Sequence, residues 1–125
     1  MPDNSFHIAE ADHAWLFSQV SAVIHHGGAG TTATAIRAGV PQVVVPFFAD
    51  QSFWADRVCA LGVASKPITM RRLSPDRLSS TLNAALTNSR MQDRAAEIGA
   101  AVSSERGVEQ ACGILERWVV GKGLA

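Results

Sequence analysis

The residue types best suited to chemistry lie together in the segment HHGGAGTT, residues 25–32. One glycine suffices for a turn, so three indicate a backbone that a ligand approaches, because glycine lacks Cβ and permits positive φ. A helix is expected to begin near Thr31, where unpaired N–H groups and the helix dipole would attract an anion. Thr31 and Thr32 add hydroxyl donors. The segment predicts an anion site, with a diphosphate as the simplest ligand; a purely structural turn is the alternative.

The two histidines are adjacent, so on an extended segment they point to opposite sides and cannot jointly bind one metal ion. We expect His25 to be hydrogen-bonded in a structural role, and His26 to face the loop and donate to a phosphate oxygen. No third ligand occurs at a recognisable spacing, so we predict no metal site. The spacing matches neither GxGxxG nor GxxxxGK[ST], which disfavours a Rossmann dinucleotide site and a P-loop.

Short apolar runs and helical patterns alternate around this segment. Strands are expected at residues 5–8, 22–25 and 42–47, with a weaker one at 62–67. The middle two lack apolar–polar alternation, as parallel strands covered on both faces do. Helices are expected at 31–38 and 51–61, and further helices follow the cap signal Ser74-Pro75-Asp76. This order predicts an α/β fold, a Rossmann-like parallel sheet with flanking helices.

Composition excludes several classes of function. The 125 residues suit one small domain, and eleven basic residues balance eleven acidic ones, so no electrostatic footprint for nucleic acid is present. No apolar run approaches the ~20 residues of a membrane span, and no signal peptide is visible. We therefore predict a cytoplasmic protein without membrane insertion. Cys59 and Cys112 are expected to be free, mostly buried thiols.

The residues HHGGAGTT…RAGVPQVVVPFFADQSFWADRV resemble the nucleotide-sugar signature of the UDP-glycosyltransferase superfamily with the GT-B fold, glycosyltransferase family 1. The likeness is to sterol and antibiotic-type glucosyltransferases, and it is strong over residues 12–58. It implies that residues 1–125 are a single, partial C-terminal nucleotide-sugar-binding domain. The N-terminal acceptor-binding domain and the first strands of the usual C-terminal sheet would then be absent from this chain.

The resemblance also implies roles for single residues. Those expected to contact the donor diphosphate are His26, Gly28, Ala29, Gly30 and Thr31. Asp50 and Gln51 match the pair that hydrogen-bonds donor sugar hydroxyls, although Asp50 could instead simply cap the following helix, or do both.

The nucleoside end of such a site is less well marked. Trp15 could flank the uracil ring or serve only in packing. Thr34 lies where many relatives carry a glutamate near the ribose. Trp54 is expected in the core.

The activity implied is transfer of a hexosyl group, with glucose expected, from a UDP-sugar to an acceptor hydroxyl, with inversion and without a metal ion or other cofactor. No catalytic base is identified, so the isolated chain is expected to be inactive. Three possibilities stay open: part of a longer enzyme, a donor-binding subunit completed by a partner chain, or a non-catalytic nucleotide-binding domain. If a missing domain normally meets the C-terminal helix, Trp118, Val119 and Val120 should be partly exposed.

Overall fold

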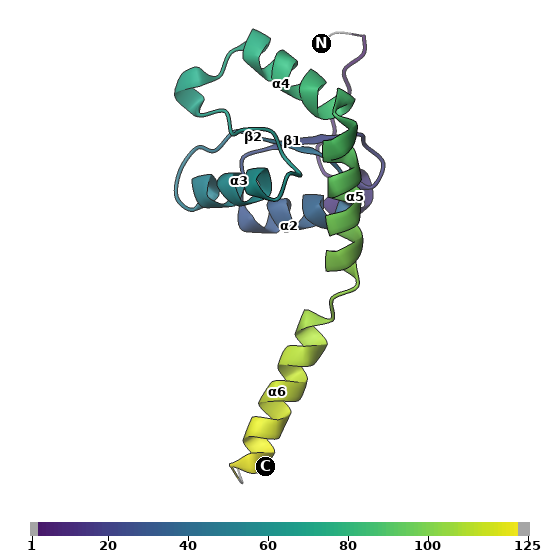
Figure 1. Ribbon diagram of the computed structural model, residues 1–125, viewed down its shortest axis with the longest axis vertical. Helices are drawn as coiled ribbons and strands as arrows, with labels where there is room; N and C mark the ends of the chain where they lie inside the picture. The colour runs from purple at the N-terminus through teal and green to yellow at the C-terminus, as the bar shows by residue number, and fades with distance from the viewer. Residues whose placement is uncertain (1–2, 123–125) are drawn as a thin grey trace.

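Two short parallel strands, β1 (Val23–His25) and β2 (Gln42–Val44), form the centre of the fold (Figure 1). On the other side of β2, the chain adds one isolated parallel bridge, between Gln42 and Ala64. The computed structural model describes residues 3–122. Within that range β1 has β2 as its only strand neighbour, so one edge of the sheet is open.

Helices surround the sheet and supply most of the regular structure. They are α1 (His13–Phe17), α2 (Ala29–Ala38), α3 (Gln51–Ala60), α4 (Pro75–Thr87), α5 (Ser89–Ser103) and α6 (Gly107–Gly121), with a 3-10 turn, η1 (Met70–Arg72), before α4. Local signals set several of their ends. The Ser74 hydroxyl accepts from Arg77 N at 3.2 Å ahead of Pro75, and α2 ends at Gly39, which has φ 70°.

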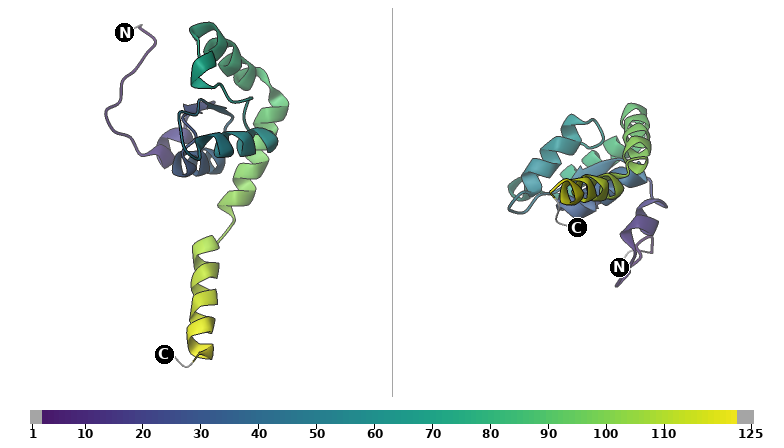
Figure 2. Two further views of the ribbon diagram at one scale, coloured as in Figure 1. Left: turned by 90° about the vertical axis from the view of Figure 1, so that its left-hand side faces the viewer. Right: turned by 90° about the horizontal axis from the view of Figure 1, so that it is seen from below.

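Both faces of β2 are buried, which explains its unbroken apolar sequence. Val44 packs in a cluster with side chains of α3 and α5, whereas Val43 and Val45 pack with side chains of α4. Successive residues of a strand point to opposite faces, so a strand covered twice needs apolar residues at every position. Figures 1 and 2 show α4 on one side of the sheet and α2 and α3 on the other. The predicted α/β class is confirmed.

Helix α5 crosses α2 at very short range. A Cβ atom on Gly99 would lie 2.7 Å from the Cα atom of Gly39 and 2.8 Å from the carbonyl oxygen of Ile36. Only a glycine at this crossing lets the two backbones meet. The contact ties the C-terminal end of α2 to the middle of α5.

Helix α6 extends away from the rest of the molecule (Figures 1 and 2). None of its residues is buried; Trp118 is 57% exposed and Val120 69% exposed, while Val119 is half-buried. The predicted partial exposure of these three residues is confirmed. No helix of the described residues is long and apolar enough to span a bilayer.

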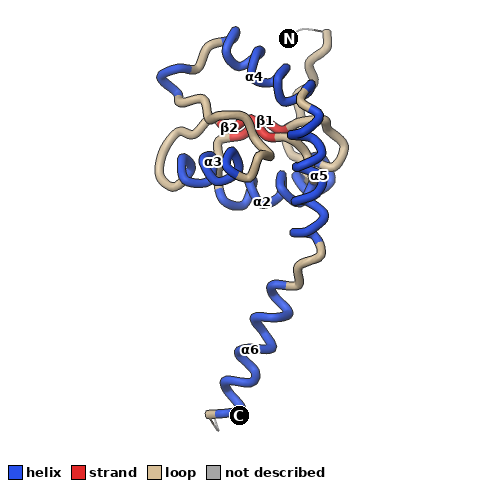
Figure 3. Tube along the Cα trace, in the orientation of Figure 1, coloured by secondary structure: helices blue, strands red, loops and turns tan. Residues whose placement is uncertain are grey.

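Several sequence-based boundaries were wrong. Residues 5–8 form no strand but part of an N-terminal loop (Figure 3), in which Phe6 is 88% exposed, because no strand within residues 3–122 lies beside them to pair with. Residues 62–67 contribute only the bridge at Ala64. The strand expected at 42–47 ends at Val44, shortly before Pro46, which has no N–H to donate to a ladder.

The cysteine prediction was half right. Cys59 and Cys112 are both free thiols, but Cys59 is only half-buried and Cys112 is exposed. Cys112 lies on α6, none of whose residues is buried, so the apolar spacing of this helix does not translate into burial.

Candidate functional site

The carboxyl ends of β1 and β2 lie at the same edge of the sheet, and the two loops that follow them touch there. Gly27, after β1, has φ 91°. A Cβ atom on it would lie 2.9 Å from the carbonyl oxygen of Gln51 and 2.9 Å from Cγ1 of Val44. Glycine is therefore required for both its conformation and its surroundings. This contact brings the predicted diphosphate-binding and sugar-binding segments together, at the edge where ligands bind in open α/β sheets.

The N-terminus of α2 forms an open cradle of main-chain N–H groups at this edge. The helix begins at Ala29, two residues earlier than predicted, because Thr32 N donates to Gly28 O at 2.9 Å and closes the first turn there. The first N–H groups of a helix have no partners within it. Ala29 and Gly30 are exposed, and a Cβ atom on Gly30 would meet no atom within 4 Å. An anion therefore has room to approach these N–H groups.

Only one of the three loop glycines, Gly27, has the positive φ that the sequence analysis expected of them. Gly28 has φ −62° as the N-cap residue, and Gly30 is helical, so the expected need for positive φ is met at Gly27 alone. Gly28 serves a different purpose. A Cβ atom on it would lie 2.5 Å from Nε2 of His26, so the missing side chain makes room for the imidazole.

That imidazole is well placed to meet an anion. His26 is exposed, and its ring lies against the N-cap residue of α2. A donor nitrogen beside the positive end of the helix adds to the field of the N–H groups. Of the five residues predicted to contact a diphosphate, Thr31 is half-buried in the first turn of α2, and the other four also lie at its start.

His25 has the structural role that was predicted. Its Nδ1 accepts from Gly27 N at 3.0 Å, so Nε2 carries the proton and donates to Gln42 Oε1 at 2.8 Å. Burial lowers the pKa of His25, and the neighbouring His26 acts in the same direction, whereas the bond to Gln42 opposes them. A neutral His25 therefore joins β1, β2 and the start of the glycine loop.

Asp50 stands at the N-cap position of α3 but does not cap it with its side chain. No side-chain cap bond forms; instead Oδ2 of Asp50 accepts from Nε1 of Trp54 at 2.8 Å. The interpretation of Asp50 as a simple helix cap is therefore wrong. Trp54 is half-buried rather than in the core, since its indole nitrogen faces this exposed carboxylate.

Gln51 holds the loop that precedes it. Its side chain is buried, and Oε1 accepts from Phe47 N at 2.8 Å and from Phe48 N at 3.2 Å. The carbonyl end is thus committed to the protein, and only the amide nitrogen remains to donate elsewhere. Ala49, between these residues, has φ 56°, an uncommon conformation for a residue with Cβ.

The two residues assigned to the nucleoside end differ in availability. Trp15 is 63% exposed on α1, so the interpretation of it as a packing residue is wrong. Thr34 donates its hydroxyl to Gly30 O at 3.0 Å, one turn back along α2. The Thr34 oxygen retains lone pairs, but its proton is used within the helix.

Sequence reasoning missed the aromatic rim of this edge. Phe47, Phe48 and Phe53 are 59%, 73% and 58% exposed around the loop that carries Asp50. The signal that could have found them was the pair of phenylalanines placed just after a buried strand and before two polar residues. Exposed aromatic rings beside polar groups are typical of ligand and partner surfaces.

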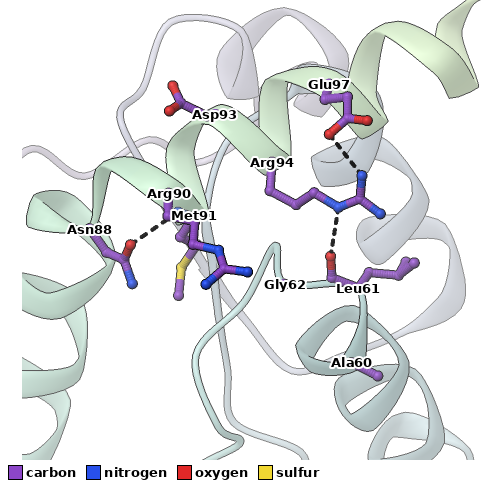
Figure 4. Close-up of a pocket in the computed structure, with 9 residues that line it drawn as sticks. All are labelled: Ala60, Leu61, Gly62, Asn88, Arg90, Met91, Asp93, Arg94 and Glu97. Atoms are coloured by element: carbon purple, nitrogen blue, oxygen red, sulfur yellow. Dashed lines mark hydrogen bonds and ion pairs between the residues drawn. The ribbon is translucent and has the colours of Figure 1, made fainter.

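A separate recess lies at the opposite, amino edge of the sheet, where α3 ends and α5 begins (Figure 4). It is lined by Ala60, Leu61, Gly62, Asn88, Arg90, Met91, Asp93, Arg94 and Glu97. Arg94 donates from Nε to Leu61 O at 3.2 Å and pairs with Glu97 at 2.7 Å, so its guanidinium is largely occupied by neighbours. Within residues 3–122, no group of three or more His, Cys, Asp or Glu side chains is placed to hold a metal ion.

The sequence matches known proteins over nearly its whole length. Residues 1–116 match the family model described as erythromycin biosynthesis protein CIII-like, C-terminal domain. The chain is 46% identical to O-mycaminosyltylonolide 6-deoxyallosyltransferase of Streptomyces fradiae, covering 94% of this chain and 28% of that protein. It is 42% identical to sterol 3-beta-glucosyltransferase UGT80B1 of Arabidopsis thaliana, covering 94% of this chain and 19% of that one. The chain therefore spans less than a third of the length of these relatives.

The fold also matches solved structures. The glycosyltransferase VinC, solved in complex with DTDP, superposes with a TM-score of 0.81 at 30% identity, over 94% of this chain and 30% of that one. The spinosyn forosaminyltransferase SpnP superposes with a TM-score of 0.88 at 25% identity, over 96% of this chain and 32% of that one. Both likenesses cover only part of a longer chain.

Proposed function

This chain belongs to the erythromycin biosynthesis protein CIII-like C-terminal domain family of GT-B glycosyltransferases, and we propose that it binds the nucleotide-sugar donor for hexosyl transfer to an acceptor hydroxyl. The observation that carries the proposal is the open cradle at the start of α2. Exposed first-turn residues, a Gly30 whose missing side chain leaves free space, and the His26 ring beside Gly28 all favour a diphosphate there.

The donor sugar would lie against the neighbouring loop. The Gly27–Gln51 contact places Asp50 next to the cradle, with one carboxylate oxygen engaged by Trp54 and the other without a partner among the described residues. A carboxylate accepts from sugar hydroxyls, and the Gln51 amide nitrogen can only donate to them. Exposed Trp15 offers a face on which a nucleobase could stack.

We propose UDP-glucose as the donor, with a dTDP-linked deoxysugar as the second candidate. Sterol 3-beta-glucosyltransferases among the relatives support glucose. The second candidate is favoured by the 6-deoxyallosyltransferase relative and by the DTDP complex of VinC. Both candidates place the same diphosphate on the same cradle, so they differ only in the base and sugar contacts.

During transfer, negative charge would grow on the departing diphosphate as the sugar–oxygen bond breaks. Main-chain N–H groups at the start of α2, the Thr31 hydroxyl and His26 would stabilise that charge, because preorganised donors cost no reorganisation at the moment of reaction. We propose that these groups suffice without a metal ion, and that attack from the opposite side inverts the anomeric carbon. The base that deprotonates the acceptor would come from outside this chain.

A donor-binding subunit that works with a separate acceptor-binding chain would use the same site, as would a non-catalytic nucleotide-binding domain. Sequencing the reading frame upstream of Met1 separates a longer enzyme from a subunit, because a continuous acceptor domain indicates the former. Full-length protein treated with EDTA should keep its transferase rate if no metal ion is needed.

Nucleotide binding itself is tested by thermal unfolding of the chain with UDP, UDP-glucose and dTDP-glucose. A ligand that binds only the folded state raises stability by mass action, about 2.7 kcal/mol at a hundredfold excess over Kd. A rise in Tm with ligand concentration supports the proposal, and the larger shift identifies the base. An unchanged Tm at millimolar concentrations of all three would contradict it.

A further inference from the structure

We propose that Trp54 is a positioning residue that holds the Asp50 carboxylate in one orientation, in which its second oxygen is available to the donor sugar. The inference rests on the proposed function, but its geometric basis is independent of it. An aspartate at an N-cap position accepts from the N–H groups of the first turn when its backbone is extended, but Asp50 has φ −77° and ψ −2°, an αR conformation. Here that bond is absent, and Oδ2 accepts from Nε1 of Trp54 instead.

The indole bond restricts the carboxylate strongly. Nε1 of Trp54 lies 2.8 Å from Oδ2, and the main-chain N–H of Trp54 donates to Asp50 O at 3.2 Å, so one residue holds the other at two points. Hydrogen bonds to an ionised carboxylate are stronger than those between neutral groups. The Trp54 ring is itself half-buried and meets the Phe53 ring edge-on, with centroids 5.1 Å apart. Oδ1 of Asp50 is thereby left for a ligand hydroxyl.

The backbone ahead of Asp50 is held in place by the side chain of Gln51. Gln51 accepts from two consecutive N–H groups, those of Phe47 and Phe48, and Ala49 takes up a left-handed conformation between them and Asp50. Backbone and side chain of Asp50 are thus both constrained. The constraint that can be removed without altering the loop is the indole N–H.

Removing that N–H should leave the Asp50 carboxylate without a fixed orientation. Trp54→Phe keeps an aromatic ring but cannot donate, so the carboxylate can rotate into other side-chain conformations. The variant should therefore stay folded, yet recognise the sugar less well. A residue with a merely structural role would instead lose stability and affect nucleotide and nucleotide-sugar alike.

The contact can be tested without any ligand, by the indole N–H resonances of the three tryptophans, Trp15, Trp54 and Trp118. The resonance missing from Trp54→Phe identifies Trp54. Asp50→Asn should shift that resonance and leave the other two in place, because Trp54 is the one tryptophan of the three whose indole donates to Asp50 in the described part of the chain. An unmoved Trp54 resonance would overturn the inference whatever the chain binds.

The functional test compares Kd for UDP with Kd for UDP-glucose, or for dTDP and dTDP-glucose if thymidine is preferred. The Kd for the free nucleotide divided by the Kd for the nucleotide-sugar reports the contribution of the sugar. We expect Trp54→Phe to reduce this ratio about fivefold, as the loss of one hydrogen bond does. The affinity for the free nucleotide should be retained. Trp118→Phe, the same change on α6, should leave both values unaltered.

A double-mutant cycle decides whether Trp54 acts through Asp50. In an Asp50→Ala background, where no side-chain oxygen remains to accept from the indole, Trp54→Phe should have no further effect on the ratio, because coupled residues are not additive. Additive losses in the Kd ratio would overturn the inference. An unchanged ratio in Trp54→Phe would also overturn it, as would a glucose group that adds no affinity in the unaltered chain. Failure of the free nucleotides to bind would instead overturn the proposed function, and this inference with it.

Discussion

The two edges of the sheet show how a hollow differs from a binding site. The amino edge, where α3 ends and α5 begins, has the more obvious recess and carries Arg90 and Arg94. The carboxyl edge, where α2 and α3 begin, presents an open rim rather than a deep cavity. At the amino edge, the Arg94 guanidinium is engaged by Leu61 O and Glu97. At the carboxyl edge, first-turn N–H groups of α2 face open space beside Gly30.

The difference lies in which polar groups still need partners. At the amino edge Arg94 is already paired, and the Arg90 guanidinium ends a long side chain that no partner among the described residues holds in place. The first-turn N–H groups of α2 are unpaired donors in a fixed frame and are therefore available to a ligand. The edges also differ in their glycines. Gly27 is enclosed by Gln51 O and Val44 Cγ1, while Gly62 has only Cγ of Arg94 near its missing Cβ, at 3.5 Å.

The largest expected effect is the loss of stability in Gly27→Ala, for which Gly62→Ala is the matched comparison. Both positions have positive φ, which costs a residue with Cβ roughly 1–2 kcal/mol. Gly27→Ala also forces a Cβ into atoms 2.9 Å away, so we expect a total loss of about 3 kcal/mol. Urea unfolding measures both variants, and equal losses would contradict the claim that the carboxyl edge is the tightly built one.

Next in size is the effect of adding one negative charge at each edge. Gly30→Asp places a carboxylate at the open start of α2, where it suits the helix dipole but repels a diphosphate. We expect UDP affinity to fall roughly 30-fold, about 2 kcal/mol, with the fold at least as stable. Calorimetric titration with UDP and thermal unfolding measure the two quantities.

The matched variant for this charge is Asn88→Asp. Asn88 lines the amino-edge recess and caps α5, accepting from Met91 N at 3.1 Å, and aspartate can keep that bond. UDP affinity should not change. A loss of UDP affinity similar to that of Gly30→Asp would indicate that the nucleotide binds at the amino edge, and would contradict its assignment to the carboxyl edge.

A smaller effect is expected from His26→Ala. The ring lies against Gly28 at the start of α2, and removing one donor to a charged ligand typically costs a little over 1 kcal/mol, or about tenfold in UDP affinity. His7→Ala, in the exposed N-terminal loop, is the control and should bind as the original chain does. Equal affinities for His26→Ala and the control would remove His26 from the cradle.

The smallest effect concerns the pH dependence that His25 imposes on the same edge. Burial holds the pKa of His25 below its ordinary value of 6.5, so the unfolded chain binds this proton more readily than the folded chain. Stability should therefore be fully present above that value and decrease as the pH falls from 6.5 toward the lowered pKa. Urea midpoints across this range should show the slope.

His25→Gln is the variant that tests the assignment. Glutamine keeps an amide N–H for Gln42 but does not titrate, so the pH slope should flatten. An unchanged slope would show that groups other than His25 control the loss of stability at acid pH.

The sequence alone determined the class of fold. Apolar residues at consecutive positions of β2 predicted a strand covered on both faces, and the structure confirms it, because burial depends on which residues occupy the strand. The histidine–glycine segment does lead into a helix start, but the anion site expected there stays a prediction.

Only the tertiary structure decided which of several local alternatives each residue takes. By its place in the sequence Asp50 could cap α3, but its αR backbone, with φ −77° and ψ −2°, does not suit a cap, and its carboxylate bonds Trp54 instead. Residues 5–8 have a strand-like sequence but no neighbour to pair with, and strand formation requires one. Gln51 was expected to serve a ligand, yet its carbonyl holds two N–H groups of the preceding loop, a contact that exists only once that loop has folded back onto α3.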